Sequence, residues 1–312
     1  MKQIIKALLM ISVIWLIFDR TGSEVMWWLN QHSQDNTSSK IKHIVEGVSE
    51  DVIMMGTSRC NGHYVPPIIS DTLHMSVYNA GIDGSDNIFA QYMALCYILH
   101  RHTPKVVCLE VQNSFLEEEE DSYHTTGYFA PYFGNNAAAD SIYHLAGTYW
   151  QYKLSHLYRY NTKVLANITG QIVNHSCDEH GYTPNPMPAN RVELSKWPNE
   201  YFHVNTEKKA YMERFIQACR EKNVFLCFVI SPSYSVVDSS YYALLKDFAA
   251  NHHVPLFDYH TSGLYLDKPD YFRDSSHLWD KSAKEYSSIF ASDLKQLDHI
   301  QKMTTQKKSS NA

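Results

Sequence analysis

Short apolar runs alternate with longer amphipathic stretches along most of the chain. The apolar runs are rich in Val, Ile, Leu and Phe, as buried β-strands are, and they lie at 51–55, 76–80, 105–111, 223–230 and 254–259. The stretches with helical spacing lie at 87–102, 207–222, 241–253 and 281–297. Strands without polar alternation, separated by helices, predict a parallel sheet covered on both faces. We therefore expect an α/β protein built as a doubly wound three-layer sandwich.

The N-terminus has a different pattern. Lys2 and Lys6 precede an apolar run that ends at Phe18, and the aromatic segment Val25–Leu29 follows. The run is shorter than the roughly twenty residues of a typical membrane span. It has no polar face, and aromatic residues are typical of a membrane boundary. We interpret residues 1–29 as an uncleaved signal anchor, a single membrane pass with the rest of the chain on the extracytoplasmic side. A cleaved signal peptide and a buried helix are the alternatives.

The remaining chain divides by composition. The polar segment 30–45 is predicted as a linker, and the α/β pattern fills residues 46–300. Between 117 and 205 this pattern is interrupted by an acidic run, by segments rich in Tyr and His, and by a Pro-rich loop. We expect this block to be an insertion or a lid beside the sheet rather than a second domain. The polar tail 301–312 is expected to fray.

Composition narrows the classes of function. The net charge of −6 offers no electrostatic reason to expect a nucleic-acid partner. The 6 cysteines form no C-x-x-C pair, and the sequence has no H-E-x-x-H motif, so neither a metal site nor a cofactor is expected. The 22 tyrosines suit a carbohydrate surface, but they suit ordinary packing as well.

A candidate nucleophile follows the first predicted strand. Ser58 lies in the sequence GTSR, and ligands of open parallel sheets bind at the carboxyl ends of the strands. A serine hydroxyl needs a base to remove its proton and a further group to orient that base. Asp274 and His277, in the sequence DSSHL, supply both. We predict that these three residues form one site, although Ser58 could also serve only to cap the next helix.

Four ordered blocks of the sequence resemble the SGNH, or GDSL-like, hydrolases. The blocks are GTSR at 56–59, NAGIDGSDN at 79–87, LEVQNSF at 109–115 and DSSHL at 274–278. This resemblance implies a flavodoxin-like sheet with strand order 2-1-3-4-5. It also implies that Ser58 is the nucleophile and that Asp274 and His277 are its acid–base pair.

The same resemblance implies an oxyanion site formed by the backbone N–H groups of Ser58 and Gly84 and by the Asn113 side-chain amide. Gly81 is an alternative candidate for the glycine whose backbone N–H binds the oxyanion. The sequence departs from the family at two places: Thr57 replaces the aspartate of the G-D-S block, and the G-x-N-D block keeps only its asparagine. Arg59 lies outside the match, and we expect it either to contact an anionic or sugar-bound group or to form a structural ion pair.

The resemblance to anchored proteins of polysaccharide O-acetylation, including the alginate acetylation proteins and the anchored protein of teichoic-acid D-alanylation, implies a function. We expect an extracytoplasmic O-acyltransferase that modifies a cell-envelope or exported polysaccharide through an acyl-serine intermediate. Such relatives imply a multi-spanning membrane acyltransferase as the partner that supplies the acyl group. A carbohydrate esterase of the same fold is one alternative. A non-catalytic scaffold or glycan-binding subunit is the other.

Overall fold

The computed structural model describes residues 1–118, 123–172, 178, 180–197 and 203–303. Its centre is a five-stranded sheet in which every pairing is parallel, with the order β2-β1-β3-β5-β7. The strands are β1 (Val52–Met55), β2 (Val77–Asn79), β3 (Val106–Glu110), β5 (Phe225–Ile230) and β7 (Leu256–Asp258). Counted along the chain this order is 2-1-3-4-5, which is the flavodoxin-like order. The predicted α/β class and all five predicted strands are confirmed.

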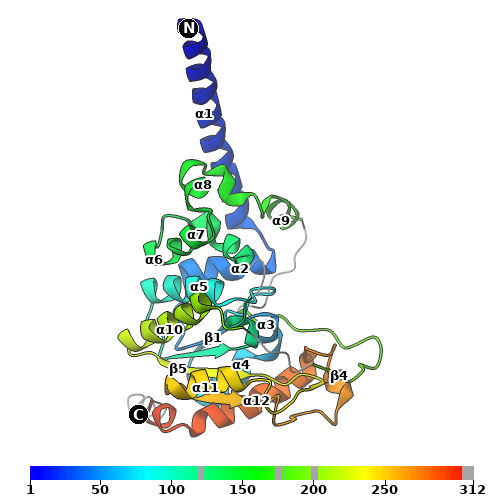
Figure 1. The fold of residues 1–312 in the computed structure, drawn as a ribbon. Helices are drawn as coiled ribbons and strands as arrows, with labels where there is room; N and C mark the ends of the chain where they lie inside the picture. The colour runs from blue at the N-terminus through cyan, green and yellow to red at the C-terminus, as the bar shows by residue number, and fades with distance from the viewer. Residues whose placement is uncertain (119–122, 173–177, 179, 198–202, 304–312) are drawn as a thin grey trace, which may run out of the picture.

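Helices cover both faces of the sheet (Figure 1). Ile53 and Met55 of β1 belong to one apolar cluster, together with α5 (Ile88–Arg101) and α10 (Thr206–Glu221). The alternate β1 residues belong to a second cluster, together with α4 (Pro66–Leu73) and α12 (Asp280–Gln296). Successive strand residues point to opposite faces, so continuous apolar runs are what a sheet buried on both sides requires. Helix α11 (Ala243–Asn251) contributes to the first cluster.

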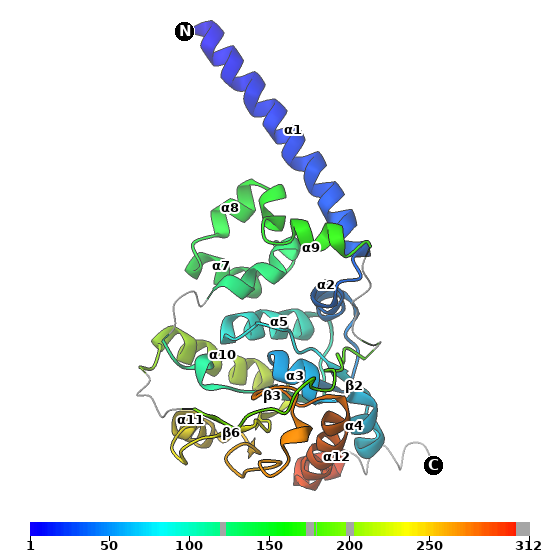
Figure 2. The same cartoon turned by 90° about the vertical axis from the view of Figure 1, so that its right-hand side faces the viewer.

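The N-terminal helix α1 (Lys2–His32) projects from the body of the molecule (Figure 2). From Asp19 onward this helix packs on the body, whereas Met1 and the apolar side chains up to Phe18 are exposed. Within the described part of the chain, none of the helices combines the length and the apolar character needed to cross a membrane.

The structure differs from the prediction at 30–45, where we expected a linker. After α1 the chain forms α2 (Asn36–Lys42) and a π-helical turn (His43–Gly47). The Asp35 carboxylate accepts the Ser38 N–H and so caps α2. Lys40 is buried, and its ammonium group donates to the carbonyl of Gly81 at 2.6 Å. A polar segment is therefore helical here because its polar groups find partners in the body.

The block 117–205 divides into two parts. The first is a set of short helices that pack against α1, α2 and α5. They are two 3-10 helices (His124–Tyr132 and Leu157–Tyr160), α6 (Ala137–Asp140), α7 (Ile142–Leu145), α8 (Tyr149–Leu154) and α9 (Val164–Thr169). The second part, residues 180–197, is mostly extended and ends in β4 (Ser195–Lys196), which pairs with β6 (Ser235–Val236).

Two further 3-10 turns flank the site described below, at Asn113–Phe115 and at Pro269–Tyr271. Residues 301–303 of the predicted tail are helical, and its remainder, 304–312, lies outside the described residues.

Candidate active site

Ser58 begins α3 (Ser58–His63) directly after the turn that ends β1. The turn depends on Gly56, which has a φ of +148°, a conformation that is costly for other residues. A Cβ atom on Gly56 would lie 2.7 Å from Cβ of Glu110 and 2.9 Å from Cβ of Cys60. Glycine therefore lets the chain pass close to β3 and presents Ser58 at the carboxyl edge of the sheet.

Asp274 and His277 lie on the loop before α12. An antiparallel bridge between Phe272 and Leu278 closes this loop. The Asp274 carboxylate accepts the N–H groups of Ser276 at 2.8 Å and of His277 at 2.9 Å. The loop conformation thus places the carboxylate next to the imidazole of its own turn.

The structure brings these three side chains together. Ser58 Oγ lies 2.9 Å from His277 Nε2, and His277 Nδ1 lies 2.9 Å from Asp274 Oδ1 and 3.1 Å from Oδ2. If Nδ1–H donates to the carboxylate, Nε2 is left to accept the proton of the serine hydroxyl. Partial burial acts to raise the pKa of Asp274, but hydrogen bonds from His277 and the backbone of Ser276 hold this pKa below its ordinary value of 3.8.

A pocket of about 560 Å³ opens at this edge of the sheet. Its lining comes from the segments that follow β1, β2 and β3, from the Asp274 loop and from aromatic residues that directly follow β4 or precede α11. The lining residues are Thr57, Ser58, Arg59, Asp86, Gln112, Asn113, Ser114, Glu117, Trp197, Tyr241, Tyr242, Ser276 and His277. Ligand-binding sites of doubly wound sheets lie at this edge.

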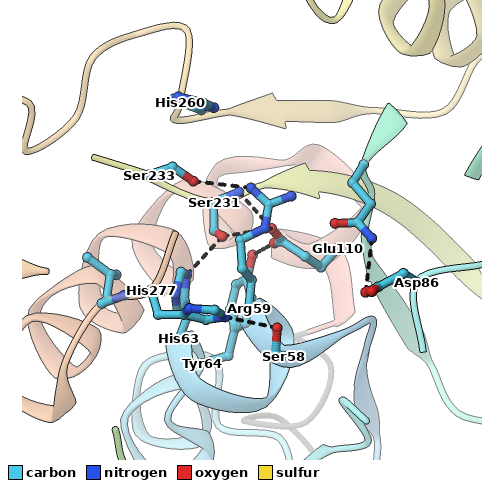
Figure 3. A network of polar contacts seen from close by, with 12 residues as sticks. Ser58, Arg59, His63, Tyr64, Asp86, Glu110, Ser231, Ser233, His260 and His277 are labelled. Carbon is cyan, nitrogen blue, oxygen red and sulfur yellow. Dashed lines mark hydrogen bonds and ion pairs between the residues drawn. The ribbon is translucent and has the colours of Figure 1, made fainter. Parts of the chain in front are cut away.

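A buried polar network adjoins the pocket, since its member Arg59 also lines the pocket (Figure 3). Glu110, at the end of β3, accepts the N–H and the hydroxyl of Ser231 at 3.0 and 2.7 Å and also accepts the hydroxyl of Tyr64. Arg59 Nε lies 3.5 Å from Glu110 Oε1, and Arg59 also donates to Ser233 Oγ at 3.3 Å. The structural ion pair expected as one possibility for Arg59 is thus present, on a residue that also lines the pocket.

Burial and ion pairing act in opposite directions on the pKa values of Arg59 and Glu110. Burial raises the pKa of Glu110, although Arg59 and the hydrogen-bond donors act against this rise. Burial acts to lower the pKa of Arg59, but the Glu110 carboxylate outweighs it and raises this pKa. A carboxylate that accepts several donors is stabilised in its ionised form.

His63 connects this network to the His277 loop. Its Nε2 accepts the backbone N–H of Leu278 at 2.9 Å, so the proton must be on Nδ1, which donates to Ser231 Oγ at 2.9 Å. Burial, together with the charges of His277 and Arg59, lowers the pKa of His63 well below its ordinary value. A neutral His63 therefore holds the residue that follows His277.

The two predicted oxyanion residues have different positions. Asn113 lines the pocket, and its amide nitrogen donates to the Tyr241 carbonyl at 2.8 Å. One amide hydrogen is thereby used, and the second is the candidate donor. Gly84 is exposed, with a φ of +71°, and it is not among the residues that line the pocket. The N–H of its competitor Gly81 already donates to the Asn79 side chain at 3.0 Å.

Sequence reasoning assigned no role to Glu110, Ser231, His63 or Trp197. Glu110 could have been found as the single charge inside the apolar run 106–111, and Ser231 as the residue that directly follows β5. Both positions are carboxyl ends of parallel strands. In contrast, nothing in the local sequence marks His63 or Trp197, because their importance comes from residues far away in the chain.

Within the described ranges, no group of three or more His, Cys, Asp or Glu side chains is placed to hold a metal ion. No protein-family model matches the chain, and no curated protein matches it. Among solved structures, the chain is similar to a crystal structure from Bacteroides fragilis described as a "putative acylhydrolase". The match covers 81% of this chain and 87% of that chain, with 11% identity and a TM-score of 0.40. A likeness this weak carries no argument about activity.

Proposed function

We propose that this protein is a serine-dependent acyl-ester enzyme of the SGNH kind that forms an acyl-serine intermediate. The observation that carries the proposal is the chain of contacts from Ser58 Oγ through His277 to Asp274, with a 2.9 Å separation at its first step. Ser58 and His277 both line a pocket that is large enough for a small ligand. The polar network of Glu110, Ser231 and His63 supports the loop that carries His277.

In the proposed first half-reaction, Ser58 Oγ attacks an ester carbonyl carbon while its proton passes to His277 Nε2. Asp274 stabilises the imidazolium that forms. The tetrahedral intermediate collapses when this proton is transferred to the leaving alcohol oxygen, and the acyl group remains on Ser58. The backbone N–H of Ser58, at the start of α3, and the Asn113 amide are the proposed oxyanion donors. Gly84 stays a prediction for this role.

In the second half-reaction, His277 removes a proton from an acceptor hydroxyl, whose oxygen attacks the acyl carbon. The C–Oγ bond to Ser58 then breaks as His277 transfers this proton to Ser58 Oγ, which restores the free serine. We propose a sugar hydroxyl of a cell-envelope or exported polysaccharide as this acceptor, which makes the enzyme an O-acyltransferase. The lining of the pocket combines the aromatic residues Trp197 and Tyr241 with the polar residues Asp86 and Gln112, and aromatic rings with hydrogen-bonding groups beside them suit a sugar ring. Water as the acceptor would make it an esterase.

The extracytoplasmic location and the membrane acyltransferase partner are parts of this proposal that rest on the sequence. Lys2 and Lys6 precede the apolar run, as in exported proteins.

Mass spectrometry after reaction with a fluorophosphonate tests the nucleophile. We expect one adduct, on Ser58, that is absent in Ser58→Ala and strongly reduced in His277→Ala. The exposed Ser288→Ala is the matched control and should be labelled like the wild type. A folded protein that stays unlabelled while a known serine esterase reacts fully would favour the non-catalytic scaffold.

A chromogenic acetyl ester supplied with and without a glycan separates transfer from hydrolysis. Faster ester cleavage that depends on the glycan, with acetylated glycan as the product, supports the O-acyltransferase. Cleavage at the same rate without glycan, with free acetate as the only acyl product, supports the carbohydrate esterase instead.

A further inference from the structure

The exposed part of α1 is apolar around its whole circumference. Ile4, Leu8, Ile11 and Trp15 share one side of the helix, and the opposite side carries Leu9, Val13, Leu16 and Ile17. Every one of these eight side chains is at least 46% exposed. Between residues 7 and 18 the single polar side chain is Ser12, and its hydroxyl donates to the Leu8 carbonyl within the helix.

This pattern identifies the kind of partner. A protein groove contacts one stripe of a helix and leaves a polar face to solvent. A helix that is apolar on all sides is covered only by an apolar environment that surrounds it, and an exposed apolar surface of this extent marks a site of interaction. The partner that fits is a lipid bilayer.

A second apolar surface stands where α1 leaves the body. The Asp19 carboxylate is buried, and it accepts the N–H groups of His156 at 3.0 Å and Leu157 at 3.1 Å. These contacts fix α1 to the chain segment that directly follows α8. Both views show α8 beside α1 near this exit point (Figures 1 and 2).

The outer side of this segment carries apolar and aromatic residues. Trp150 and Leu154 lie four residues apart on α8 and are 61% and 64% exposed, and Tyr158 is 41% exposed. Lys153 lies between them in sequence, with its ammonium group 5.5 Å from the Trp150 ring centroid. Lysine beside exposed tryptophan and tyrosine is the composition of a membrane–water boundary.

The geometry points to a membrane-contact platform, which we define as Trp150, Lys153, Leu154 and Tyr158. We propose that the apolar part of α1 inserts into a bilayer and that this platform lies at the headgroup level around the point of entry. Lys2, Lys6 and Lys153 favour anionic headgroups. From Ile4 to Phe18 the helix is about 22 Å long at ~1.5 Å per residue, which is less than the hydrocarbon thickness of ~30 Å. An interfacial platform adds the contact area that such a short helix lacks.

This proposal goes beyond the predicted anchor, because it assigns a role to the insertion. It does not depend on the reaction proposed for Ser58.

The primary test mixes the full chain with phosphatidylglycerol-containing vesicles whose acyl chains are brominated near the headgroup. Bromine quenches the fluorescence of tryptophan side chains that lie close to it. We expect Trp150→Phe to remove part of the quenched signal. The matched control Trp279→Phe, near the candidate active site, should leave the quenched signal unchanged.

Vesicle flotation at limiting lipid provides a second readout. The double variant Trp150→Ser/Leu154→Ser should need about tenfold more lipid for half-maximal binding, since two half-inserted side chains are lost. The control Met187→Ser/Leu194→Ser replaces two residues that are 69% and 47% exposed on the extended segment and should shift this midpoint less than about twofold. Binding should weaken when phosphatidylcholine replaces the anionic lipid.

The proposal is overturned if Trp150 contributes nothing to the quenched signal, or if the platform and control variants bind vesicles equally. It is also overturned if the platform variant breaks a lipid-free oligomer, seen by analytical ultracentrifugation, without changing vesicle binding. In that case the surface contacts a second copy of the chain.

Discussion

The Asp274 carboxylate shapes its own loop as well as orienting the imidazole of His277. It accepts two backbone N–H groups of the turn and contacts His277 Nδ1. Asparagine can accept the backbone donors with its one carbonyl oxygen, but it lacks the charge that stabilises an imidazolium. Residue chemistry and loop conformation can therefore be separated by a single substitution.

We expect Asp274→Asn to slow the fluorophosphonate reaction of Ser58 by a factor of about 100 or more. The free energy of unfolding should change by less than about 1 kcal/mol, because the side chain is half-exposed. Labelling rates and urea unfolding measure the two quantities. Asp270→Asn, in the 3-10 turn that precedes this loop, is the control. Equal labelling rates in both variants would contradict the proposed role of Asp274.

His63 is a positioning residue, because it contacts the backbone after His277 and is buried outside the lining of the pocket. His63→Phe leaves the buried Leu278 N–H without its acceptor, which should cost about 1–3 kcal/mol of stability. Ser58 labelling should slow by about tenfold or more, since a displaced loop misplaces the base. His63→Gln, whose carbonyl oxygen can accept this N–H, should recover most of the rate. If Ser58 in His63→Phe is labelled as fast as in the wild type, at a temperature at which the variant is folded, the positioning role is ruled out.

At the level of elements, the turn from β1 into α3 decides where the nucleophile lies. Gly56 combines a positive φ with a close approach to Glu110 and Cys60. Gly134 also has a positive φ, of +98°, but a Cβ atom there would meet no atom within 4 Å. The two glycines separate backbone strain from steric overlap.

We expect Gly56→Ala to destabilise the protein by about 3 kcal/mol or more, because strain and overlap add. Gly134→Ala should cost only about 1 kcal/mol, from strain alone. Urea unfolding midpoints of the two variants test this difference. A similar shift in both would mean that the sheet edge adapts to a side chain at position 56.

The insertion shows how one block can serve two surfaces. Its helical part packs against α1, α2 and α5, whereas Glu117 and Trp197 near its two ends line the pocket. We expected an insertion or a lid at 117–205. In the described residues, the main contacts of its helices outside the block are with α1, α2 and α5, whereas Trp197 at the end of its extended part lines the pocket.

At the level of the whole molecule, buried histidines link stability to pH. His260 is buried against Tyr242 and Ser235, and burial lowers its pKa from 6.5 to about 4. Between these values the unfolded chain binds a proton that the folded protein does not, so stability falls as pH decreases. His63 acts in the same direction. Asp140, whose pKa burial raises to about 6, acts in the opposite direction below that pH.

We therefore expect His260→Gln to flatten the fall in unfolding free energy between pH 6.5 and about 4, by up to about 3 kcal/mol over this window. The exposed His100→Gln is the control and should leave the slope as in the wild type. Urea unfolding across this pH range measures both. An unchanged slope in His260→Gln would show that the buried imidazole does not control acid stability.

The sequence by itself determined the sheet and its main helices. The strands 51–55 and 105–111 are continuous apolar runs, because a sheet covered on both faces needs apolar side chains on both sides, and this requirement is local. The contact of Ser58 with His277 could also be predicted, since the carboxyl ends of parallel strands share one edge. The resemblance of ordered blocks indicated which loop would approach that edge.

Only the tertiary structure decided the remainder. Lys40 lies in a polar segment that resembles a linker. It becomes part of a helix because the Asn61 side chain and the Gly81 carbonyl accept hydrogen bonds from its ammonium group. Glu110 and His63 gain their roles because folding brings Ser231 and Leu278 beside them. Hydrogen bonds and buried ion pairs depend on which distant groups meet after folding, whereas apolar periodicity depends only on the element itself. A single sequence therefore shows strands and helices more clearly than it shows buried hydrogen bonds and ion pairs.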